Sequence, residues 1–573
     1  MTSNNKNSYP LIIIGAGIAG TIAARCVAES GIRAALVSSA KFFSGSSFYP
    51  GTWGFGLIGP KNEGDIDKLC EGIATIGQYT NYPSLTRHFA SSILPSINEL
   101  ERYKVELQKP SANAQNQEEF IPCFDSEWRT WRGITQDSYK SALEVSIQDS
   151  QLDLFEYHEL IDIVVENEEV RGVVLFDAHA KRITTLSCKA LILATGGFSG
   201  LFNRSLGSKL ANGVAQGIMI NKGALCTNLE FMQIMQGYCK PKSGIVFNEK
   251  IYKNISLTTP QGDDILQLYQ ENQSINVQDL IYPNQELLNE RSKHGPFTCE
   301  RISAIVDRAI SSYVHRGVLA QFNSKDNTPE FVETYFSWLE NSQGISRHDS
   351  IELAPYAHAA NGGLLINEAA QTSLKGIWAA GEVTGGMHGA DRIGGLASAN
   401  ALVFGLVAAR EAMKYCLNCQ DSIGANESKN LHTLSDIKLA YSPHFKEHRK
   451  TLKDIMTSSF MLERNESQLQ QALNTLQNLL SGYTQVALAE LSNKADLAHA
   501  QSVYSQITSA YALCFSALMR DESRGSHDRA DYRAHKHSLA CPQVICKGKN
   551  QDDSLTLESC FDSDYACLAS IRW

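Results

Sequence analysis

The sequence has no long apolar run and no basic leader segment. The first apolar run, residues 11–14, ends at Gly15, and the longest later stretch, residues 396–407, contains Ser398 and Asn400. Both are shorter than the about 20 apolar residues that a membrane-spanning helix needs. The sequence therefore predicts no transmembrane segment and no signal peptide, and we interpret residues 396–407 as a buried helix.

The sequence also lacks low-complexity tracts, fixed-period repeats and an excess of positive charge. It carries 51 lysines and arginines against 61 aspartates and glutamates, a formal net charge of -10. This balance repels nucleic acid and anionic lipid, so we exclude nucleic acid as a partner. The hydrophobic fraction of 43% and the length of 573 residues suit a globular protein with several domain-sized units.

A paired cysteine motif is missing as well. The 14 cysteines are scattered, and Cys416 and Cys419 form a CxxC without a second pair, which Cys541 and Cys546 do not supply. A structural zinc site needs four ligands at suitable spacing. We therefore predict no metal site, and we interpret the cysteines as reduced thiols of a cytoplasmic protein.

A glycine pattern near the start of the chain points to a nucleotide. Residues 10–37 read as a strand, a GxGxxG turn, a helix and a second strand, the length of a dinucleotide-binding unit. The glycines permit a tight turn and a close approach of backbone to a pyrophosphate, at a helix N-terminus that favours anions. We predict that Gly15, Gly17, Ile18, Ala19 and Gly20 hold this pyrophosphate.

The second strand ends without the carboxylate that usually binds a ribose hydroxyl. Ser38 and Ser39 occupy this place and are predicted to contact the nucleotide. The missing acid argues against a simple NAD site more than against FAD.

Glycine-rich segments return later in the chain, separated by other patterns. Short β-rich runs fill residues 151–197 and end in Ala194, Thr195, Gly196 and Gly197, which we predict to contact the cofactor. Residues 240–350 are more polar and are predicted to be more helical. A second glycine-rich block covers residues 361–405, and helical patterns follow over about 430–520. We predict a first part of the cofactor domain over 1–238, a capping domain over 239–350, the second part over 351–425, and a helical domain and tail over 426–573. A chain that leaves its core and returns makes a cleft, where ligands usually bind.

Two segments resemble a known family. Residues 44–54, SGSSFYPGTWG, resemble the segment that lies along the flavin in L-aspartate oxidases, and residues 376–395, GIWAAGEVTGGMHGADRIGG, resemble the family's second FAD motif almost residue for residue. The chain is thus similar to the FAD-dependent oxidoreductase 2 family of fumarate reductase, succinate dehydrogenase and L-aspartate oxidase flavoproteins. A further match, ESRGSH at 522–527, extends the resemblance toward the tail.

The resemblance implies an α/β fold, with a two-dinucleotide-binding FAD domain, an inserted α+β capping domain and a C-terminal helical domain. It also implies that Glu382 contacts the ribityl or ribose hydroxyls of FAD. The further contacts that it implies are Ser46, Ser47, Gly54, Gly381, Gly395 and Ser398. Residues 40–60 contain no histidine that could bond covalently to FAD, so the FAD is expected to be non-covalent.

The resemblance also implies how a substrate is held. Arg392 matches the arginine that grips a substrate carboxylate, for which a guanidinium has a suitable fork of donors. His358 matches the histidine of the pattern His-x-x-x-Gly-Gly, and Arg301 is the candidate for proton transfer. Arg301 is two residues out of register, since the family's position falls on Ser303.

One departure concerns the second carboxylate contact. Met235 stands where the family has a histidine, and a thioether neither donates a hydrogen bond nor carries charge. We predict hydride transfer between flavin N5 and a small carboxylate, as in L-aspartate oxidase. The alternatives are an enoate reductase or dehydrogenase of the fumarate reductase and succinate dehydrogenase type, and a flavoprotein subunit whose partner holds Fe–S clusters or haem.

Overall fold

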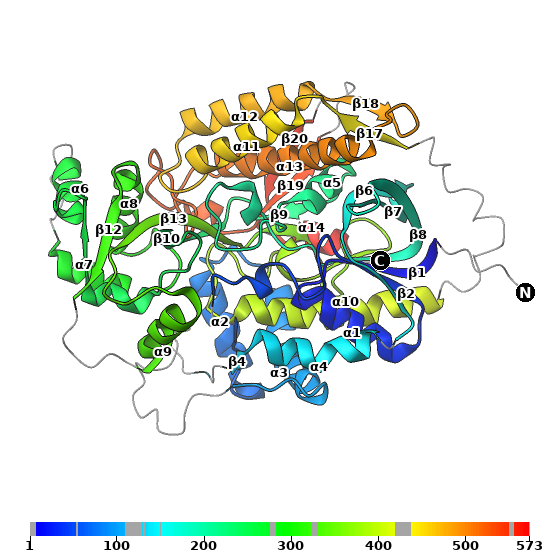
Figure 1. Ribbon diagram of the computed structural model, residues 1–573, viewed down its shortest axis with the longest axis horizontal. Helices are drawn as coiled ribbons and strands as arrows, with labels where there is room; N and C mark the ends of the chain where they lie inside the picture. Colours follow the sequence, from blue (N-terminus) through cyan, green and yellow to red (C-terminus); the bar gives the residue numbers. More distant parts are fainter. Residues whose placement is uncertain are drawn as a thin grey trace, which may run out of the picture.

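The computed structural model describes residues 7–52, 55–108, 129, 132–148, 150–274, 282–323, 330–418, 437–548 and 555–571. It contains three assemblies, namely a cofactor-type α/β core, a cap, and a set of C-terminal helices (Figure 1). This arrangement confirms the predicted fold class.

The core is built on a sheet in the spatial order β5-β2-β1-β8-β7-β6, with β15 also paired to β8. Strands β5, β2, β1, β8 and β15 are parallel, and the β6-β7-β8 meander is antiparallel. The strands are β1 (Ser8–Ile14), β2 (Ala34–Val37), β5 (Leu152–Phe155), β6 (His158–Glu166), β7 (Glu169–Asp177), β8 (Arg182–Leu193) and β15 (Ile377–Ala379). Because β15 comes from the second glycine-rich block, two distant parts of the chain complete one sheet.

Helices cover the parallel strands because those strands are apolar on both faces. Helices α1 (Ile18–Ser30), α4 (Gln136–Gln148) and α10 (Leu396–Asn418) contact these strands, while α3 (Pro83–Arg102) packs on α10 and α2 (Ile66–Ile76) packs on α3. The short pair β3 (Phe55–Leu57) and β4 (Arg132–Ile134) lies beside them. A Cβ on Gly405 would lie 2.5 Å from Cγ2 of Ile22, so this glycine lets α10 cross α1 closely. Within the described ranges, α10 alone is long and apolar enough to cross a membrane, and 61% of its apolar window is buried, as the prediction of a buried helix requires.

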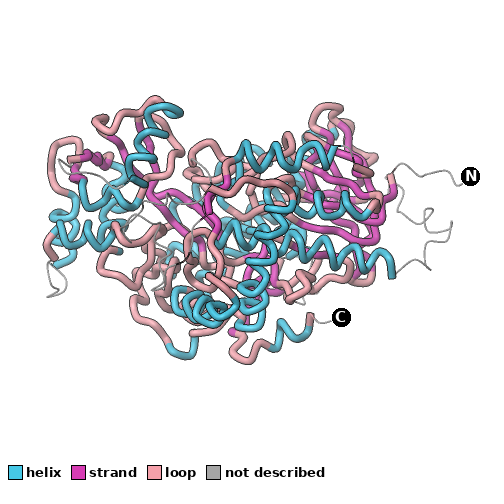
Figure 2. Tube along the Cα trace, turned by 90° about the horizontal axis from the view of Figure 1, so that it is seen from below, coloured by secondary structure: helices cyan, strands magenta, loops and turns pink. Residues whose placement is uncertain are grey.

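The cap has its own sheet and hydrophobic core. Its antiparallel strands follow the order β10-β13-β12-β11, and long strands β10 and β13 connect it to the core. Its elements are β10 (Met232–Lys240), β11 (Ile255–Thr258), α6 (Ile265–Ser274), α7 (Asn284–Arg291), α8 (Ala304–Tyr313), β12 (Val318–Phe322), α9 (Glu330–Trp338) and β13 (Ile351–Ala360). Figure 2 shows strands gathered toward both ends of the molecule, in the core sheet and in the cap. The predicted helices of 240–350 are present, together with two strands that the sequence pattern did not indicate.

The C-terminal part packs against the core through one long helix. Helix α13 lies on α5, where a Cβ on Gly217 would meet the Ser505 carbonyl oxygen at 1.9 Å, and the tail strand β19 pairs with β9 of the core. The core elements on this side are α5 (Val214–Asn221), β9 (Cys226–Thr227), β14 (Gly363–Leu365) and β16 (Thr384–Gly385). The C-terminal elements are β17 (Lys438–Tyr441), α11 (Phe445–Ser459), α12 (Glu466–Ser481), β18 (Thr484–Ala487), α13 (Lys494–Met519), β19 (Gln543–Lys547), β20 (Leu557–Phe561) and α14 (Ala566–Ser570).

Candidate functional site

A cavity of about 610 Å³ lies at the carboxyl ends of β1, β2 and β8, where nucleotides bind in open parallel sheets. The structure brings most of the predicted cofactor residues into its lining. These are Gly15, Gly17, Ile18, Ala19, Ser38, Ser39, Ser46, Ser47, Ala194, Thr195, Gly196, Gly381, Glu382, Gly395 and Ser398, together with His358 and Arg392.

The turn between β1 and α1 forms one wall of the cavity. A Cβ on Gly20 would lie 1.8 Å from the Gly15 carbonyl oxygen, so Gly20, which does not line the cavity, packs the helix against the turn. Helix α1 begins after Gly17 without a side-chain cap and without an acidic residue in its first turn. Its N-terminus therefore offers backbone amides and a positive dipole end to an anion.

Small hydroxyl side chains complete this side. The amide of Ile18 donates to Ser47 Oγ (3.4 Å), and the amide of Ser208 donates to Ser46 Oγ (3.1 Å). Thr195 Oγ1 is buried and has no hydrogen-bond partner among the described residues. An amide cradle with an unused hydroxyl fits the phosphates and hydroxyls of a dinucleotide.

Glu382 faces the cavity from the second glycine-rich block. Its Oε1 accepts a hydrogen bond from the Ala360 amide (3.0 Å), and burial raises the pKa of its carboxyl. Gly197 lies behind it, because a Cβ there would meet Glu382 Oε1 at 2.4 Å. A partly buried carboxylate on a cavity wall suits a hydroxyl donor such as a ribose or ribityl group.

Arg392 is held by an amide side chain rather than by a carboxylate. Its Nη2 donates to Gln233 Oε1 (2.7 Å), and Gln233 Nε2 donates to Asp391 Oδ1 (2.7 Å). Arg392 is 8% exposed, and its Nε atom is buried without a partner among the described residues. Burial raises the pKa of Asp391 to about 6, while the Gln233 hydrogen bond acts against that increase. The guanidinium thus keeps a donor for an anion in the cavity.

Two histidines lie near Arg392 and are neutral. Burial, and then the Arg392 charge, lower the pKa of His358 to about 4, and the same two causes lower the pKa of His388 well below its ordinary value. His358 Nδ1 is buried without a partner in the described chain. His388 does not line the cavity and packs edge-on against Phe89. Of the two, only His358 can present a neutral ring nitrogen to a ligand.

One predicted catalytic residue, Arg301, lies away from the cavity. Arg301 is exposed in the turn before α8 and does not line the cavity, so its role stays a prediction. Ser303 stands where the family has its proton-transfer arginine; it is buried, and its Oγ forms a hydrogen bond with His294 Nε2 (2.7 Å). Gly54 lies outside the described residues.

Met235 is buried in an apolar cluster at the base of the cap. It packs with Leu206, Val246, Ala354 and Tyr356, and Leu206 lines the cavity. Met235 itself does not line the cavity, so this position provides no second polar contact for a carboxylate.

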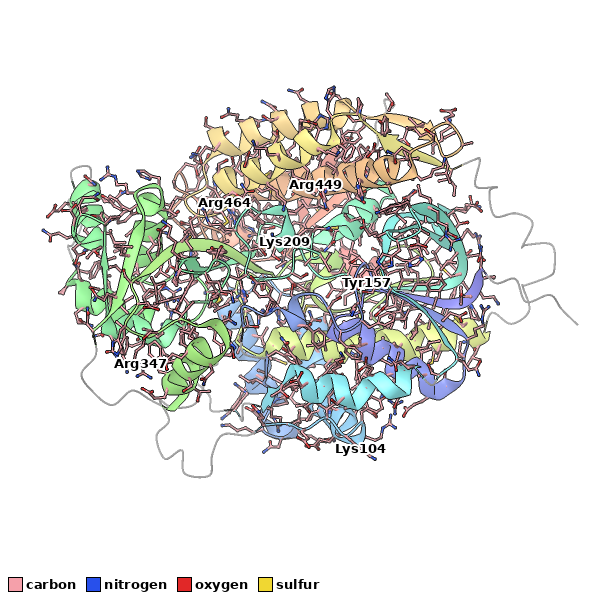
Figure 3. The ribbon with its side chains drawn as sticks, in the orientation of Figure 1. Lys104, Tyr157, Lys209, Arg347, Arg449 and Arg464 are labelled. Carbon is pink, nitrogen blue, oxygen red and sulfur yellow. The ribbon has the colours of Figure 1, made fainter. Side chains whose placement is uncertain are left out.

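The sequence pattern missed a basic group on the cavity wall. Lys209, Arg449 and Lys453 line it. Burial lowers the pKa of Lys453, and the positive charges of Lys209 and Arg449 lower it further. Figure 3 labels Lys209 and Arg449. Arg449 and Lys453 lie on α11, four residues apart, in a domain that we did not assign to the cofactor. The spacing of Arg449 and Lys453, one helical turn apart, was the only sign in the sequence that they share a helix face. Such pairs are common on exposed helix faces, so the spacing alone does not predict a cavity wall.

The chain matches two family models. The model described as "FAD binding domain" covers residues 11–253 and 306–397, and the one described as "Fumarate reductase flavoprotein C-term" covers residues 449–560. A fumarate reductase flavoprotein subunit of a Serratia species is 22% identical over 91% of this chain and 89% of its own length. A fumarate reductase (CoM/CoB) subunit from Methanothermobacter marburgensis is 24% identical over 91% of this chain and 94% of its own length.

A solved structure shares the fold. Mycobacterium smegmatis Sdh1 in complex with UQ1 superimposes with a TM-score of 0.76 at 20% identity, over 97% of this chain and 94% of that one. The two relatives carry fumarate reductase names, so they favour the alternative interpretation over the L-aspartate oxidase interpretation.

Proposed function

Because this chain belongs to the FAD-dependent oxidoreductase family of the fumarate reductase flavoproteins, we propose that it reduces an unsaturated carboxylate, or oxidises its saturated product. FAD, when bound, supplies the hydride chemistry. The protein's part is to bind, orient and polarise the substrate.

Arg392 carries the proposal. A carboxylate that reaches its unpartnered Nε would accept the donor that the fold leaves free and would neutralise a buried cation. Gln233 fixes the guanidinium from the other side, so a bound substrate meets a preset orientation. Held in this way, the carboxylate can carry the negative charge that develops when the β-carbon of the enoate accepts a hydride, because the electron pair of the C=C bond then moves to the α-carbon next to the carboxylate.

His358 supports the same carboxylate as a neutral donor. Since its pKa is lowered to about 4, it contributes a hydrogen bond and no charge at neutral pH. Proton transfer by Arg301 rests on the resemblance alone, because its exposed side chain does not line the cavity.

The cofactor is proposed to be non-covalent, because residues 40–60 contain no histidine. A partner protein or small carrier is proposed to exchange electrons with it, since the relatives named above are described as subunits. A cytoplasmic location follows from the unpaired cysteine usage and is proposed on that ground only.

The test is an anaerobic absorbance experiment on the purified yellow protein. The oxidised protein is mixed with succinate or L-aspartate, and the dithionite-reduced protein with fumarate or crotonate. Reoxidation by an enoate, or bleaching by succinate, supports the proposal. Bleaching by L-aspartate alone would replace it with the oxidase interpretation, which Ser46 and Ser47 at the cavity favour. No response to any of the four acids would contradict a carboxylate substrate of this size.

A further inference from the structure

Three side chains that favour metals meet where the cap touches the tail. Cys299 and Glu300 lie in the turn before α8, and His535 lies in the tail after α13. Their sulfur, oxygen and nitrogen atoms all lie within 4.8 Å of one another. Cys299 Sγ is 3.6 Å from Glu300 Oε1, and His535 Nε2 is 2.7 Å from Glu300 Oε2.

We propose that Cys299, Glu300 and His535 bind a zinc ion that joins the cap to the C-terminal tail. Thiolate, imidazole and carboxylate together suit zinc, whereas magnesium and calcium prefer oxygen ligands alone. Three protein ligands leave the fourth position to water. The sequence did not indicate this metal site, because His535 lies more than two hundred residues after Cys299 and Glu300.

The distances suit this ion. Tetrahedral zinc with ordinary bond lengths places a sulfur and an oxygen ligand about 3.5 Å apart, and the Cys299 and Glu300 atoms are 3.6 Å apart. The 2.7 Å contact of His535 is to the other carboxylate oxygen, Glu300 Oε2. If Glu300 Oε1 is the zinc ligand, His535 Nε2 has to lie about 3.3 Å from Oε1 instead. The side chains of His535 and Glu300 are 39% and 22% exposed, so an ion reaches them from solvent and a modest shift is available.

Backbone contacts already hold the two segments together. The Cys299 amide donates to the Gly525 carbonyl (2.9 Å), and the Gly525 amide donates to Glu300 Oε1 (2.7 Å). A ligand oriented by a second hydrogen bond binds a metal more tightly. The junction is therefore arranged before the ion arrives, and little ordering is needed on binding.

The junction also contacts the segment that leads to Arg392. Ser526, next to Gly525, donates from both its amide (3.1 Å) and its hydroxyl (2.9 Å) to the Ala390 carbonyl. Zinc at the junction would fasten the cap turn and this segment to the same tail. Occupancy is thus expected to make the cap harder to separate from the core.

The experiment uses FAD-loaded protein, stripped with a chelator and kept under a thiol-free reductant. Zinc is titrated against a competing chromophoric chelator, and cobalt is titrated while absorbance is recorded. We expect one tight equivalent, a thiolate-to-cobalt band, and a higher melting temperature with zinc but not with magnesium. Cys299→Ser and His535→Ala should each weaken binding at least about tenfold and abolish the increase in melting temperature.

Two variants serve as matched controls. Cys560→Ser and His537→Ala replace exposed residues of the same types in the same part of the chain, and both should bind zinc like the wild type. Retained flavin absorbance in all four variants reports folding. Zinc binding that survives in Cys299→Ser or His535→Ala, or stripped wild type that takes up no zinc, would overturn the proposal.

Discussion

Arg392 is a buried cation whose nearest side-chain partner is an amide. Burial lowers its pKa, and the charges of Asp391 and Glu382 act against that decrease. Gln233 joins the guanidinium to Asp391 without a direct side-chain ion pair to it. The charge is therefore kept available for a ligand, which is the reverse of a structural salt bridge.

Replacing Arg392 by lysine keeps the charge and removes the fork of donors. Loss of one preorganised donor to a developing anion typically costs about 10²–10³-fold in rate, so kcat/KM for the carboxylate should fall by this order. The bound flavin should remain. Arg410→Lys, at an exposed arginine near Glu99, is the control, and steady-state kinetics with flavin absorbance measure both. An unchanged kcat/KM in Arg392→Lys would remove Arg392 from the proposed site.

The neutral His358 gives a prediction for pH. Its folded pKa of about 4 lies below the ordinary value of 6.5, so between these values the unfolded chain takes up the proton first. His358 therefore costs stability as the pH falls through this window, by at most about 3 kcal/mol. His358→Gln should lose less melting temperature than wild type between about pH 7 and about pH 4.5. His537→Gln, at an exposed position, should follow the wild type, and identical curves for all three proteins would contradict the prediction.

At the scale of single residues, the sequence predicts the site residues that belong to recognisable motifs. Arg392, His358 and Glu382 stand in recognisable patterns and do line the cavity. Gln233 was not predicted, because its function depends on a contact with a side chain 159 residues away. No local pattern reports such a pairing.

Among the elements, the turn between β1 and α1 is the most tightly constrained. Gly15 has φ +110°, and a Cβ there would lie 2.2 Å from the Ala194 carbonyl oxygen at the end of β8. The turn can therefore bring α1 to the cavity only with glycine at this position.

Gly15→Ala should abolish flavin binding and lower the free energy of unfolding by more than about 2 kcal/mol. The added Cβ is strained at this positive φ and also overlaps the Ala194 carbonyl oxygen, and a backbone shift that relieves one of these would not relieve the other. Gly31→Ala is the control, since Gly31 also has positive φ, +70°, but no atom lies within 4 Å of its added Cβ. That change should cost about 1 kcal/mol and leave the flavin in place. Flavin content and chemical denaturation measure both, and equal losses in the two variants would contradict the argument.

Strands and helices of the core were predictable because their patterns are local. The pattern predicts the second strand at residues 34–37, as observed, and the helix at residues 21–29, whereas α1 begins three residues earlier, at Ile18. The basic residues of α11 were not predicted as part of the cavity, since which face of a helix meets another domain is decided by packing. The cap strands β11 and β12 were missed for a similar reason, as their pairing partners lie far along the chain.

For the whole molecule, the main question is how the cap is fastened to the rest. Arg308 on α8 donates to Asp528 in the tail (2.7 Å), and the side chains are 15% and 0% exposed. Asp528 also accepts from Arg533 (2.7 Å). This buried pair links the cap to the C-terminal part, independently of the proposed zinc ligands.

Arg308→Met should leave Asp528 partly uncompensated and destabilise the protein by about 3 kcal/mol, the lower end for a broken buried pair, because Arg533 remains. Proteolysis within the cap should become faster. Arg347→Met removes a more exposed pair with Glu333, with side chains 26% and 43% exposed, and should cost no more than about 1 kcal/mol. Thermal unfolding and limited proteolysis compare the two, and equal effects would show that the junction does not hold the cap.

The cavity draws its walls from almost the whole chain, from Ile14 in β1 to Gln506 in α13. During synthesis the N-terminal part of a chain emerges from the ribosome first, and domains generally fold in the order in which they emerge. The glycine turn therefore emerges long before the helix that closes the far wall. The complete cavity can therefore form only after α13 has been made, so we expect FAD to bind the chain late in its synthesis or after it.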